Sequence, residues 1–252
     1  MKSTNKNTYV GQLANQSRKI WVFLKYFNSV RLEYLQLVFI DDEPLNGQKK
    51  RTQVIREIFG AFKPSLVIET GTFLANTTRY FAELLSVVNP AGKVTTVELN
   101  DLFHNVSVGK LSKYDNVECV HASSNAFFGS AKLDRRAHTV FYLDAHWNDY
   151  LPLRDELKEI VSFGESIVII DDFKVETDVS GFGYDDYGNV IGRLDLDHIS
   201  DLLDEFRIFF PTYSAEEDGG NRRGVVFLSK GDAAFQVLKR CSELSEFTQG
   251  AT

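Results

Sequence analysis

Short apolar runs alternate with longer amphipathic segments through residues 52–205 of the chain. The apolar runs are rich in Val, Ile and Leu, as in strands that are buried on both faces. A regular alternation of such strands with helices predicts a parallel sheet with helices packed on it. We expect strands at 66–69, 94–98, 117–121, 139–143 and 166–170, and helices near 52–62, 77–87, 102–114, 152–163 and 196–205.

The C-terminal part of the chain has a different pattern. Residues 175–195 carry glycines and aromatic residues without helical or strand periodicity. Two apolar runs, 206–212 and 224–229, flank the charged loop 215–223, which is typical of an antiparallel hairpin at the end of a sheet. Together with the strands above, this hairpin predicts an α/β fold: a doubly wound, seven-stranded sheet whose last strand is antiparallel.

Residues 9–41 predict one or two helices in front of this sheet. Their apolar face consists of Ile20, Val22, Phe23, Tyr26 and Phe27. Such a face needs a partner, and it either packs on the chain's own sheet or forms a homodimer interface over the ligand site. Because the stretch 44–51 is polar and turn-rich, we expect an N-terminal helical extension at 1–50 and one α/β domain at 51–252.

Length, charge and cysteine content narrow the class of protein. The 252 residues, 43% of them hydrophobic, can bury one large core. The net charge of −7 argues against a nucleic-acid partner, because that binding needs clustered Lys and Arg. The two cysteines, Cys119 and Cys241, are too few and too far apart for a disulfide framework or a metal-binding motif. We therefore expect a cytoplasmic protein. The N-terminus is polar and Lys25 interrupts the run 20–24, so we expect neither a signal peptide nor a membrane span.

A strand–turn–helix–strand segment carries the first candidate site. The first strand ends at Glu69, the chain turns on Gly71 into a helix near Asn76, and the second strand ends at Glu98. Gly71 allows a tight turn against a ligand, and a helix start offers N–H groups to it. A carboxylate at the second strand end can accept both hydroxyls of a ribose. These features favour a nucleoside-binding unit over an ordinary βαβ crossover.

The glycine spacing indicates which nucleoside is bound. The positions after Gly71 lack the further glycines of G-x-G-x-x-G, so NAD and FAD are not expected, and no G-K-[ST] phosphate loop follows. The E-x-G-x pattern, followed by V-E at the next strand end, resembles motifs I and II of the Rossmann-like S-adenosylmethionine-dependent methyltransferases. The resemblance implies that Glu69, Gly71 and Thr72 face the methionine part of the cofactor. It also implies that Glu98 binds the ribose.

The resemblance extends to the strand order and to the third strand end. A seven-stranded sheet that ends in an antiparallel hairpin matches the strand order of methyltransferases better than that of dehydrogenases. In that family the adenine lies after the third strand, where this chain has Ser123, Ser124 and Asn125. Their side chains are candidate contacts to the adenine ring, and they are equally good candidates for a helix N-cap.

Acidic residues follow the fourth and fifth strands and form the second candidate site. Asp144 and His146 follow the fourth strand, and Asp171 and Asp172 follow the fifth. Carboxylates brought together at one edge of a parallel sheet repel each other unless a cation or a proton is shared. A hard divalent ion such as Mg²⁺ or Mn²⁺ would relieve this repulsion. The alternative is that Asp171 caps the following segment and Asp172 is solvated.

The pattern D-x-[HD] after strand four with D-D after strand five resembles a narrower group. It is similar to the metal-dependent O-methyltransferases that act on sugar hydroxyls of macrolide and aminocoumarin antibiotics, and to the cephalosporin hydroxylase group. The resemblance implies that Asp144, Asp171 and Asp172 hold the metal, with Asp144 also at the cofactor. His146 stands where that group has a general base, usually aspartate, which leaves base, ligand and packing residue as roles for it.

The sequence as a whole predicts an S-adenosylmethionine-dependent O-methyltransferase. The expected acceptor is a hydroxyl of a sugar, glycan or small natural product, and the expected catalytic residues are His146 and Asp144. One alternative keeps the cofactor and uses His146 as base without a metal. Another is a non-catalytic Rossmann-like binding protein, whereas a hydrolase built on Asp144 and His146 would leave Glu98 without a role.

Two further segments give weaker signals. The run 181–188 is either a lid with Tyr184 and Tyr187 on the acceptor or an ordinary surface hairpin. Arg222 and Arg223 are expected at the end of a solvated loop. His104, His121 and His198 are expected to be structural or exposed.

Overall fold

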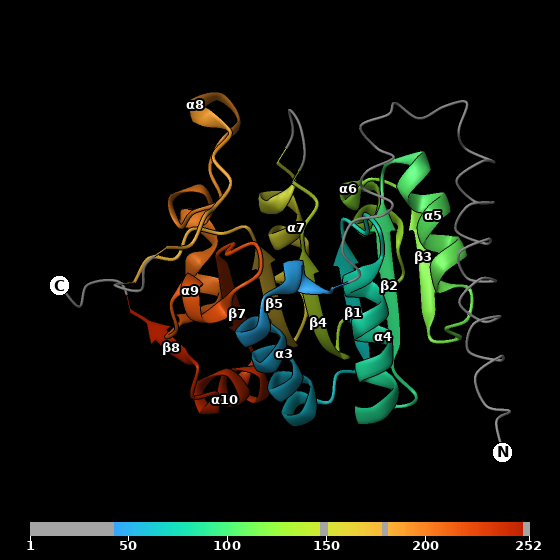
Figure 1. Cartoon of the computed structure of the whole chain (residues 1–252), viewed down its shortest axis with the longest axis horizontal. Helices are drawn as coiled ribbons and strands as arrows, with labels where there is room; N and C mark the ends of the chain where they lie inside the picture. The colour runs from blue at the N-terminus through green and yellow to red at the C-terminus, as the bar shows by residue number, and fades with distance from the viewer. Residues whose placement is uncertain (1–42, 147–150, 178–180, 249–252) are drawn as a thin grey trace, which may run out of the picture. The chain divides into compact units, whose positions relative to one another are not determined.

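The computed structural model describes residues 43–146, 151–177 and 181–248, and its centre is an eight-stranded sheet (Figure 1). The strand order is β3-β2-β1-β4-β5-β7-β6-β8. Pairing is parallel from β3 to β5, whereas β7 is antiparallel to β5 and β6, and β8 is antiparallel to β6. The strands are β1 Leu66–Thr70, β2 Lys93–Glu98, β3 Val117–His121, β4 His138–Leu143, β5 Glu165–Asp171, β6 Arg207–Pro211, β7 Val225–Lys230 and β8 Leu244–Phe247.

The α/β, Rossmann-like class and its C-terminal antiparallel part are confirmed, with one strand more than the sequence predicted. Strand β8 extends the sheet beyond β6, in a register that pairs Ile208 with Phe247 and Pro211 with Leu244. Its four residues, Leu-Ser-Glu-Phe, are too short and too polar to stand out as an apolar run.

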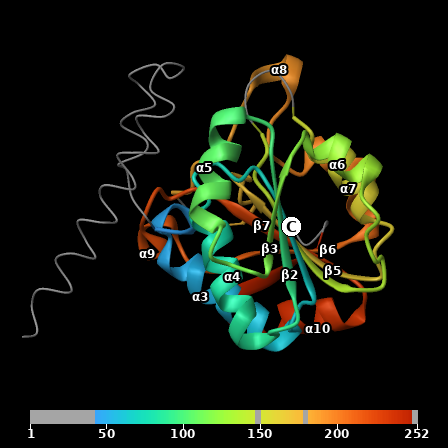
Figure 2. The same ribbon diagram turned by 90° about the vertical axis from the view of Figure 1, so that its right-hand side faces the viewer.

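Helices cover both faces of the sheet (Figure 2). One face packs against α3, α4 and α10, and the other against α6, α7 and η3. The helices are η2 Leu45–Gly47, α3 Lys49–Phe62, α4 Asn76–Val88, α5 Asp101–Leu111, α6 Ser124–Ser130, α7 Leu153–Ile160, α8 Gly188–Ile191, η3 Asp197–Glu205, α9 Ala215–Asp218 and α10 Asp232–Arg240. None of the helices in the described ranges is long and apolar enough to cross a membrane.

Local sequence signals set the helix ends next to the sheet edge that carries the candidate sites. The side chain of Asn100 caps α5 by accepting from the backbone N–H groups of Leu102 and Phe103. Ser123 caps α6 by accepting from the N–H of Ala126. These caps fix where the chain leaves β2 and β3, and therefore where the residues at those strand ends lie.

The described part of the chain begins just before α3. Leu45, in η2, is buried in the core on the α3 side of the sheet. The helices predicted within 9–41 lie outside the described residues. The 1–50 extension, the 51–252 domain and the homodimer through the extension therefore stay predictions.

A buried polar network joins α3 to the ends of β5 and β7. The fully buried Arg51 donates to the Asp171 carboxylate and to the backbone carbonyls of Arg223 and Gly224. Tyr142 donates to the other Asp171 oxygen at 2.5 Å. A charge without solvent must be paired, so this network fixes α3 against the carboxyl end of β5.

We predict that Arg51→Ala lowers the free energy of unfolding by about 3–5 kcal/mol, because the Asp171 carboxylate would stay buried without its cation. Urea denaturation followed by circular dichroism measures this loss. The matched control is Arg56→Ala, on an exposed position of the same helix, with an expected change within about 0.5 kcal/mol. A loss at Arg51 no larger than at Arg56 would contradict the structural role.

Candidate active site

The carboxyl ends of β2, β1, β4 and β5 are neighbours in the sheet and carry all the predicted site residues except the two serines. Strand β1 lies between β2 and β4, with Thr70 in register with Val97 on one side and Leu143 on the other. The chain order reverses at this point, and ligands of open α/β sheets bind in the crevice outside such a switch point.

Gly71 makes a close backbone approach at this edge. Its φ is +85°, and a Cβ at this position would lie 2.2 Å from the carbonyl oxygen of Asp144. Its N–H donates to the carbonyl of Val97 at 2.9 Å, and the N–H of Asp144 donates to the carbonyl of Thr70 at 2.9 Å. Only glycine fits this turn, so the loop after β1 is held directly against the loop after β4.

Glu69 lies beneath this loop in a dry environment. It is almost fully buried, and its Oε2 accepts from the hydroxyls of Thr78 and Thr96, the latter at 2.6 Å. Thr72 extends the chain of contacts, with its hydroxyl 2.6 Å from that of Thr96. Burial raises the pKa of Glu69 from 4.5 to about 7, against the opposing effect of the two hydroxyl donors.

Glu98 is held by the backbone of both neighbouring loops. Its Oε2 accepts from the N–H of Phe73 and its Oε1 from the N–H of Asn100, both at 2.8 Å. Each oxygen keeps a second lone pair for a ligand hydroxyl. The next residue, Leu99, is 69% exposed, which makes it an apolar surface directly beside the carboxylate.

The two serines after β3 lie at the start of α6. Ser123 is the helix N-cap, so the capping alternative holds for it, and its oxygen accepts from Ala126 at 3.2 Å. Ser124 is nine-tenths buried. A capping hydroxyl keeps its own proton for donation, so this geometry leaves the proposed adenine contact of Ser123 available.

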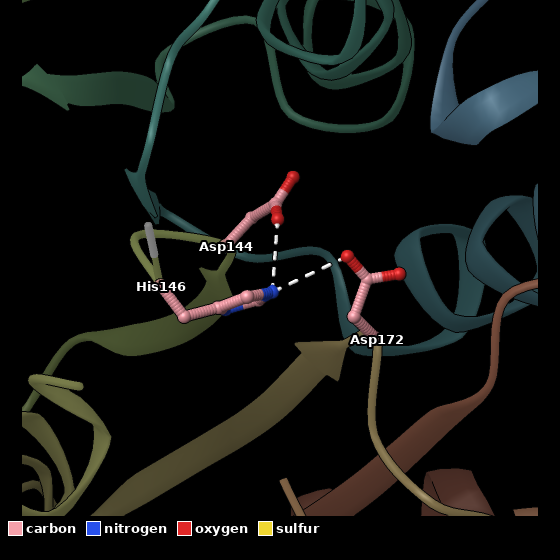
Figure 3. A group of neighbouring side chains, drawn as sticks. All are labelled: Asp144, His146 and Asp172. Carbon is pink, nitrogen blue, oxygen red and sulfur yellow. Dashed lines mark hydrogen bonds and ion pairs between the residues drawn. The ribbon is translucent and has the colours of Figure 1, made fainter. Parts of the chain in front are cut away.

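Asp144, His146 and Asp172 converge on one point (Figure 3). The Nε2 atom of His146 lies 3.5 Å from Oδ1 of Asp144 and 3.3 Å from Oδ2 of Asp172. The three candidate ligand atoms lie within 4.8 Å of one another, and His146 is only 4% exposed. Burial, and then the charges of Asp171 and Asp172, raise the pKa of Asp144 well above its usual range. Oxygen and imidazole atoms in this arrangement fit a divalent cation.

Asp171 faces away from this group. Its oxygens are bound by Arg51 and Tyr142, and Asn46 donates to it at 3.3 Å. Although burial opposes it, the Arg51 guanidinium holds the pKa of Asp171 below its usual range. Of the predicted metal ligands, the structure therefore brings Asp144 and Asp172 together around His146, and it gives Asp171 a different set of partners.

Three side chains contact the site in ways that the sequence did not predict. Arg223, expected on a solvated loop, instead pairs with both Asp172 and Asp185, so that prediction is wrong. Asp185 lies 3.8 Å from Nε2 of His146, and the hydroxyl of Tyr187 contacts the His146 carbonyl. Asp185 and Tyr187 belong to the glycine-rich run 181–188, which the sequence did single out. Nothing in the local sequence indicates the role of Arg223.

This fold is Rossmann-like, and its candidate site lies at the carboxyl ends of neighbouring parallel strands. A family model described as Rhamnosyl O-methyltransferase/CmcI matches residues 49–190. Since this is more than half of the 252 residues, the chain belongs to that family. It is an S-adenosylmethionine-dependent O-methyltransferase, and the resemblance in its motifs is confirmed.

Solved structures share this fold. The O-methyltransferase from Bacillus cereus in complex with S-adenosylhomocysteine is 15% identical, covers 79% of this chain and 89% of its own, and has a TM-score of 0.55. TomG from Streptomyces achromogenes, involved in tomaymycin synthesis and solved with S-adenosylmethionine, is 11% identical over 73% of this chain and 80% of its own, with a TM-score of 0.52. A search of curated proteins finds no match.

We predict a pH dependence of stability that comes from Glu69. Its folded pKa of about 7 lies above the ordinary 4.5, so the protonated carboxyl favours the folded state. That contribution is fully present below pH ~4.5 and is lost as the pH rises to about 7, which amounts to roughly 3 kcal/mol. Glu69→Gln, which keeps an acceptor for Thr78 and Thr96, should match the native protein at low pH and exceed its stability above pH ~7.

Urea denaturation of both proteins between pH 4.5 and pH 8 tests this prediction. Glu118→Gln, on an exposed position of β3, is the matched control and should follow the native curve. Parallel curves for the native protein and Glu69→Gln would show that the carboxyl is ionised in the folded state at all these pH values.

Proposed function

We propose that the chain methylates a hydroxyl of a sugar, glycan or small natural product with the help of a divalent metal ion. The observation that carries the proposal is the Asp144–His146–Asp172 group, which lies directly beside the Gly71 loop. A group that can activate a hydroxyl therefore borders the place where the methyl donor is expected. Small hydroxylated acceptors also suit the net charge of −7, which does not favour nucleic acid.

The cofactor site of this proposal is the edge formed by β1, β2 and β3. S-adenosylmethionine, when bound, supplies a sulfonium methyl group that is already electrophilic. Gly71 and Thr72 border the space for its methionine part above Glu69, and the free lone pairs of Glu98 accept the ribose hydroxyls. The exposed Leu99 is suited to lie against the adenine face, and Ser123 to meet its ring edge, whereas Ser124 is buried and hydrogen-bonded to Glu156.

In the metal part of the proposal, the ligands are Asp144, His146 and Asp172. Asp171 is not a ligand, because Arg51 and Tyr142 bind its oxygens. A divalent ion held there, Mg²⁺ or Mn²⁺, would lower the pKa of a bound acceptor hydroxyl. The fold itself places the three ligand atoms together: one carboxylate oxygen after β4, one after β5, and one imidazole nitrogen. Asp171 orients Asp172 by accepting from its N–H at 2.9 Å.

A second candidate mechanism has no metal and uses His146 as general base. It is favoured by the arginines, because Arg51 and Arg223 already offset Asp171 and Asp172. Nε2 of His146 would then take the acceptor proton, and the carboxylates of Asp144 and Asp172 would stabilise the imidazolium that forms. A cytoplasmic location and a homodimer are proposed from the sequence alone.

We predict that S-adenosylhomocysteine binds the purified chain and raises its melting temperature, since a ligand of the native state stabilises it. Glu98→Ala should weaken this binding by roughly 1.5–3 kcal/mol, the usual loss for a charged hydrogen-bond acceptor. Isothermal titration calorimetry gives both affinities, and Glu118→Ala on the neighbouring strand is the control with native affinity. Binding of NADH in place of S-adenosylhomocysteine would overturn the assigned cofactor site.

We predict that Mn²⁺ binds with S-adenosylhomocysteine present, and that Asp172→Asn lowers its affinity by about 10–100-fold or more. Electron paramagnetic resonance of free and bound Mn²⁺ measures this without an acceptor. Asp186→Asn is the matched control, because Asp186 pairs with Arg193 instead of facing the site. No Mn²⁺ binding, together with methyl transfer that survives EDTA, would reject the metal and leave His146 as the base.

A further inference from the structure

The segment that follows β5 returns to the active site through residues 181–187. Its backbone is tied to both neighbouring strands: the N–H of Asp185 donates to the carbonyl of Asp172 at 3.0 Å, and the N–H of Gly224 donates to the carbonyl of Gly183 at 2.7 Å. In Figure 1 this segment leads to α8, at the top of the view. The position of Asp185 is therefore set by the end of β5 and the start of β7.

Asp185 and Tyr187 contact the same histidine from two sides. Oδ2 of Asp185 lies 3.8 Å from Nε2 of His146, and the Tyr187 hydroxyl lies against the main-chain carbonyl of His146. Oδ2 of Asp185 accepts from the same hydroxyl at 2.5 Å, so its single proton is shared between this carboxylate and the His146 carbonyl. Burial, and then the bond to Asp185, raise the pKa of Tyr187, so the hydroxyl keeps its proton and remains a donor at neutral pH.

Arg223 supplies the counter-charge for this arrangement. Its Nε binds Oδ1 of Asp172 and its terminal nitrogen binds Oδ1 of Asp185. The guanidinium therefore links the end of β5 to the returning segment, and it leaves the second oxygen of each carboxylate turned towards His146. A planar guanidinium has the donor geometry needed to bridge two carboxylates at once.

These contacts distinguish the segment from an ordinary surface hairpin. A surface hairpin would show polar side chains bound to solvent or to each other, as Asp186 does with Arg193 at the segment's outer side. Asp185 and Tyr187 instead contact a residue, His146, that is only 4% exposed and follows a different strand. Two residues of one short segment thus hold the ring and the backbone of the same residue.

We propose that Asp185 and Tyr187 are positioning residues that hold His146 in its working orientation, with Arg223 holding Asp185 in place. The inference rests on the proposed role of His146 at the reacting centre. Asp185 acts on the ring through its charge, 3.8 Å from Nε2, and Tyr187 restrains the main chain through the His146 carbonyl. His146 needs a fixed orientation in either role, as ligand or as base, because both depend on where Nε2 points.

The test is histidine-selective NMR of the full chain, labelled with ¹⁵N in the imidazole rings. The chain has five histidines, and His146→Ala identifies the signals of His146. The variants are Asp185→Asn and Tyr187→Phe, which keep the shape of each side chain. Their matched controls are Asp186→Asn and Tyr184→Phe, which make the same chemical changes at neighbouring positions of the segment.

We expect both variants to shift or broaden the ring signals of His146, and both controls to leave them unchanged. The signals of the other histidines should keep their positions in all four variants; they are His104, His121, His138 and His198. Melting temperatures measured alongside separate this result from a loss of fold. Unchanged His146 signals in Asp185→Asn and Tyr187→Phe would overturn the inference, as would equal shifts in the controls.

Titration with S-adenosylhomocysteine keeps this test separate from the proposed function. Both variants should bind it with native affinity, because neither residue contacts the Gly71 loop or Glu98 among the described contacts. A chain that does not bind S-adenosylhomocysteine would count against the proposed function even if the NMR shifts appear as expected.

Discussion

The buried ion pair between Arg51 and Asp171 is the constraint on which the site depends. A guanidinium and a carboxylate without solvent require each other, so helix α3 and strand β5 have one relative position. Asp171 continues the face of β5 that packs on α3, while Asp172 has a φ of +54° and turns out of the strand. Of the two adjacent aspartates, Asp171 therefore has a structural role and Asp172 belongs to the candidate site.

A second constraint joins the loop after β1, where we propose that the cofactor binds, to the residues after β4 that we propose act on the acceptor. The backbone of Gly71 touches the carbonyl of Asp144, so any shift of the loop after β1 moves the start of the loop that carries His146. In the proposed mechanism, the methyl donor and the activating group would therefore share one rigid support. In-line transfer depends on this kind of fixed separation, because the sulfonium already provides the electrophile and the protein mostly provides geometry.

The sequence predicts the parts of this molecule that rest on local patterns. Apolar runs located β1 to β5, and the acids at strand ends located Glu98, Asp144 and Asp172. It could not separate Asp171 from Asp172, because that depends on Arg51, 120 positions away in the chain. Arg223 was likewise missed, since its partner Asp172 is 51 positions distant and an arginine in a polar loop is usually solvated.

The charges around His146 limit what the site can do. Arg223 takes one oxygen of Asp172 and one of Asp185, and the remaining oxygens, with Oδ1 of Asp144, surround a single imidazole nitrogen. An imidazole nitrogen can donate one proton to only one of these oxygens, so Arg223 and the raised pKa of Asp144 relieve the repulsion among the carboxyl groups only in part. The arrangement is stabilised when positive charge is added at that point, either as a divalent ion or as the proton that leaves an acceptor hydroxyl. Both outcomes would draw a hydroxyl oxygen towards the same place, which is what the proposed removal of an acceptor proton beside the Gly71 loop requires.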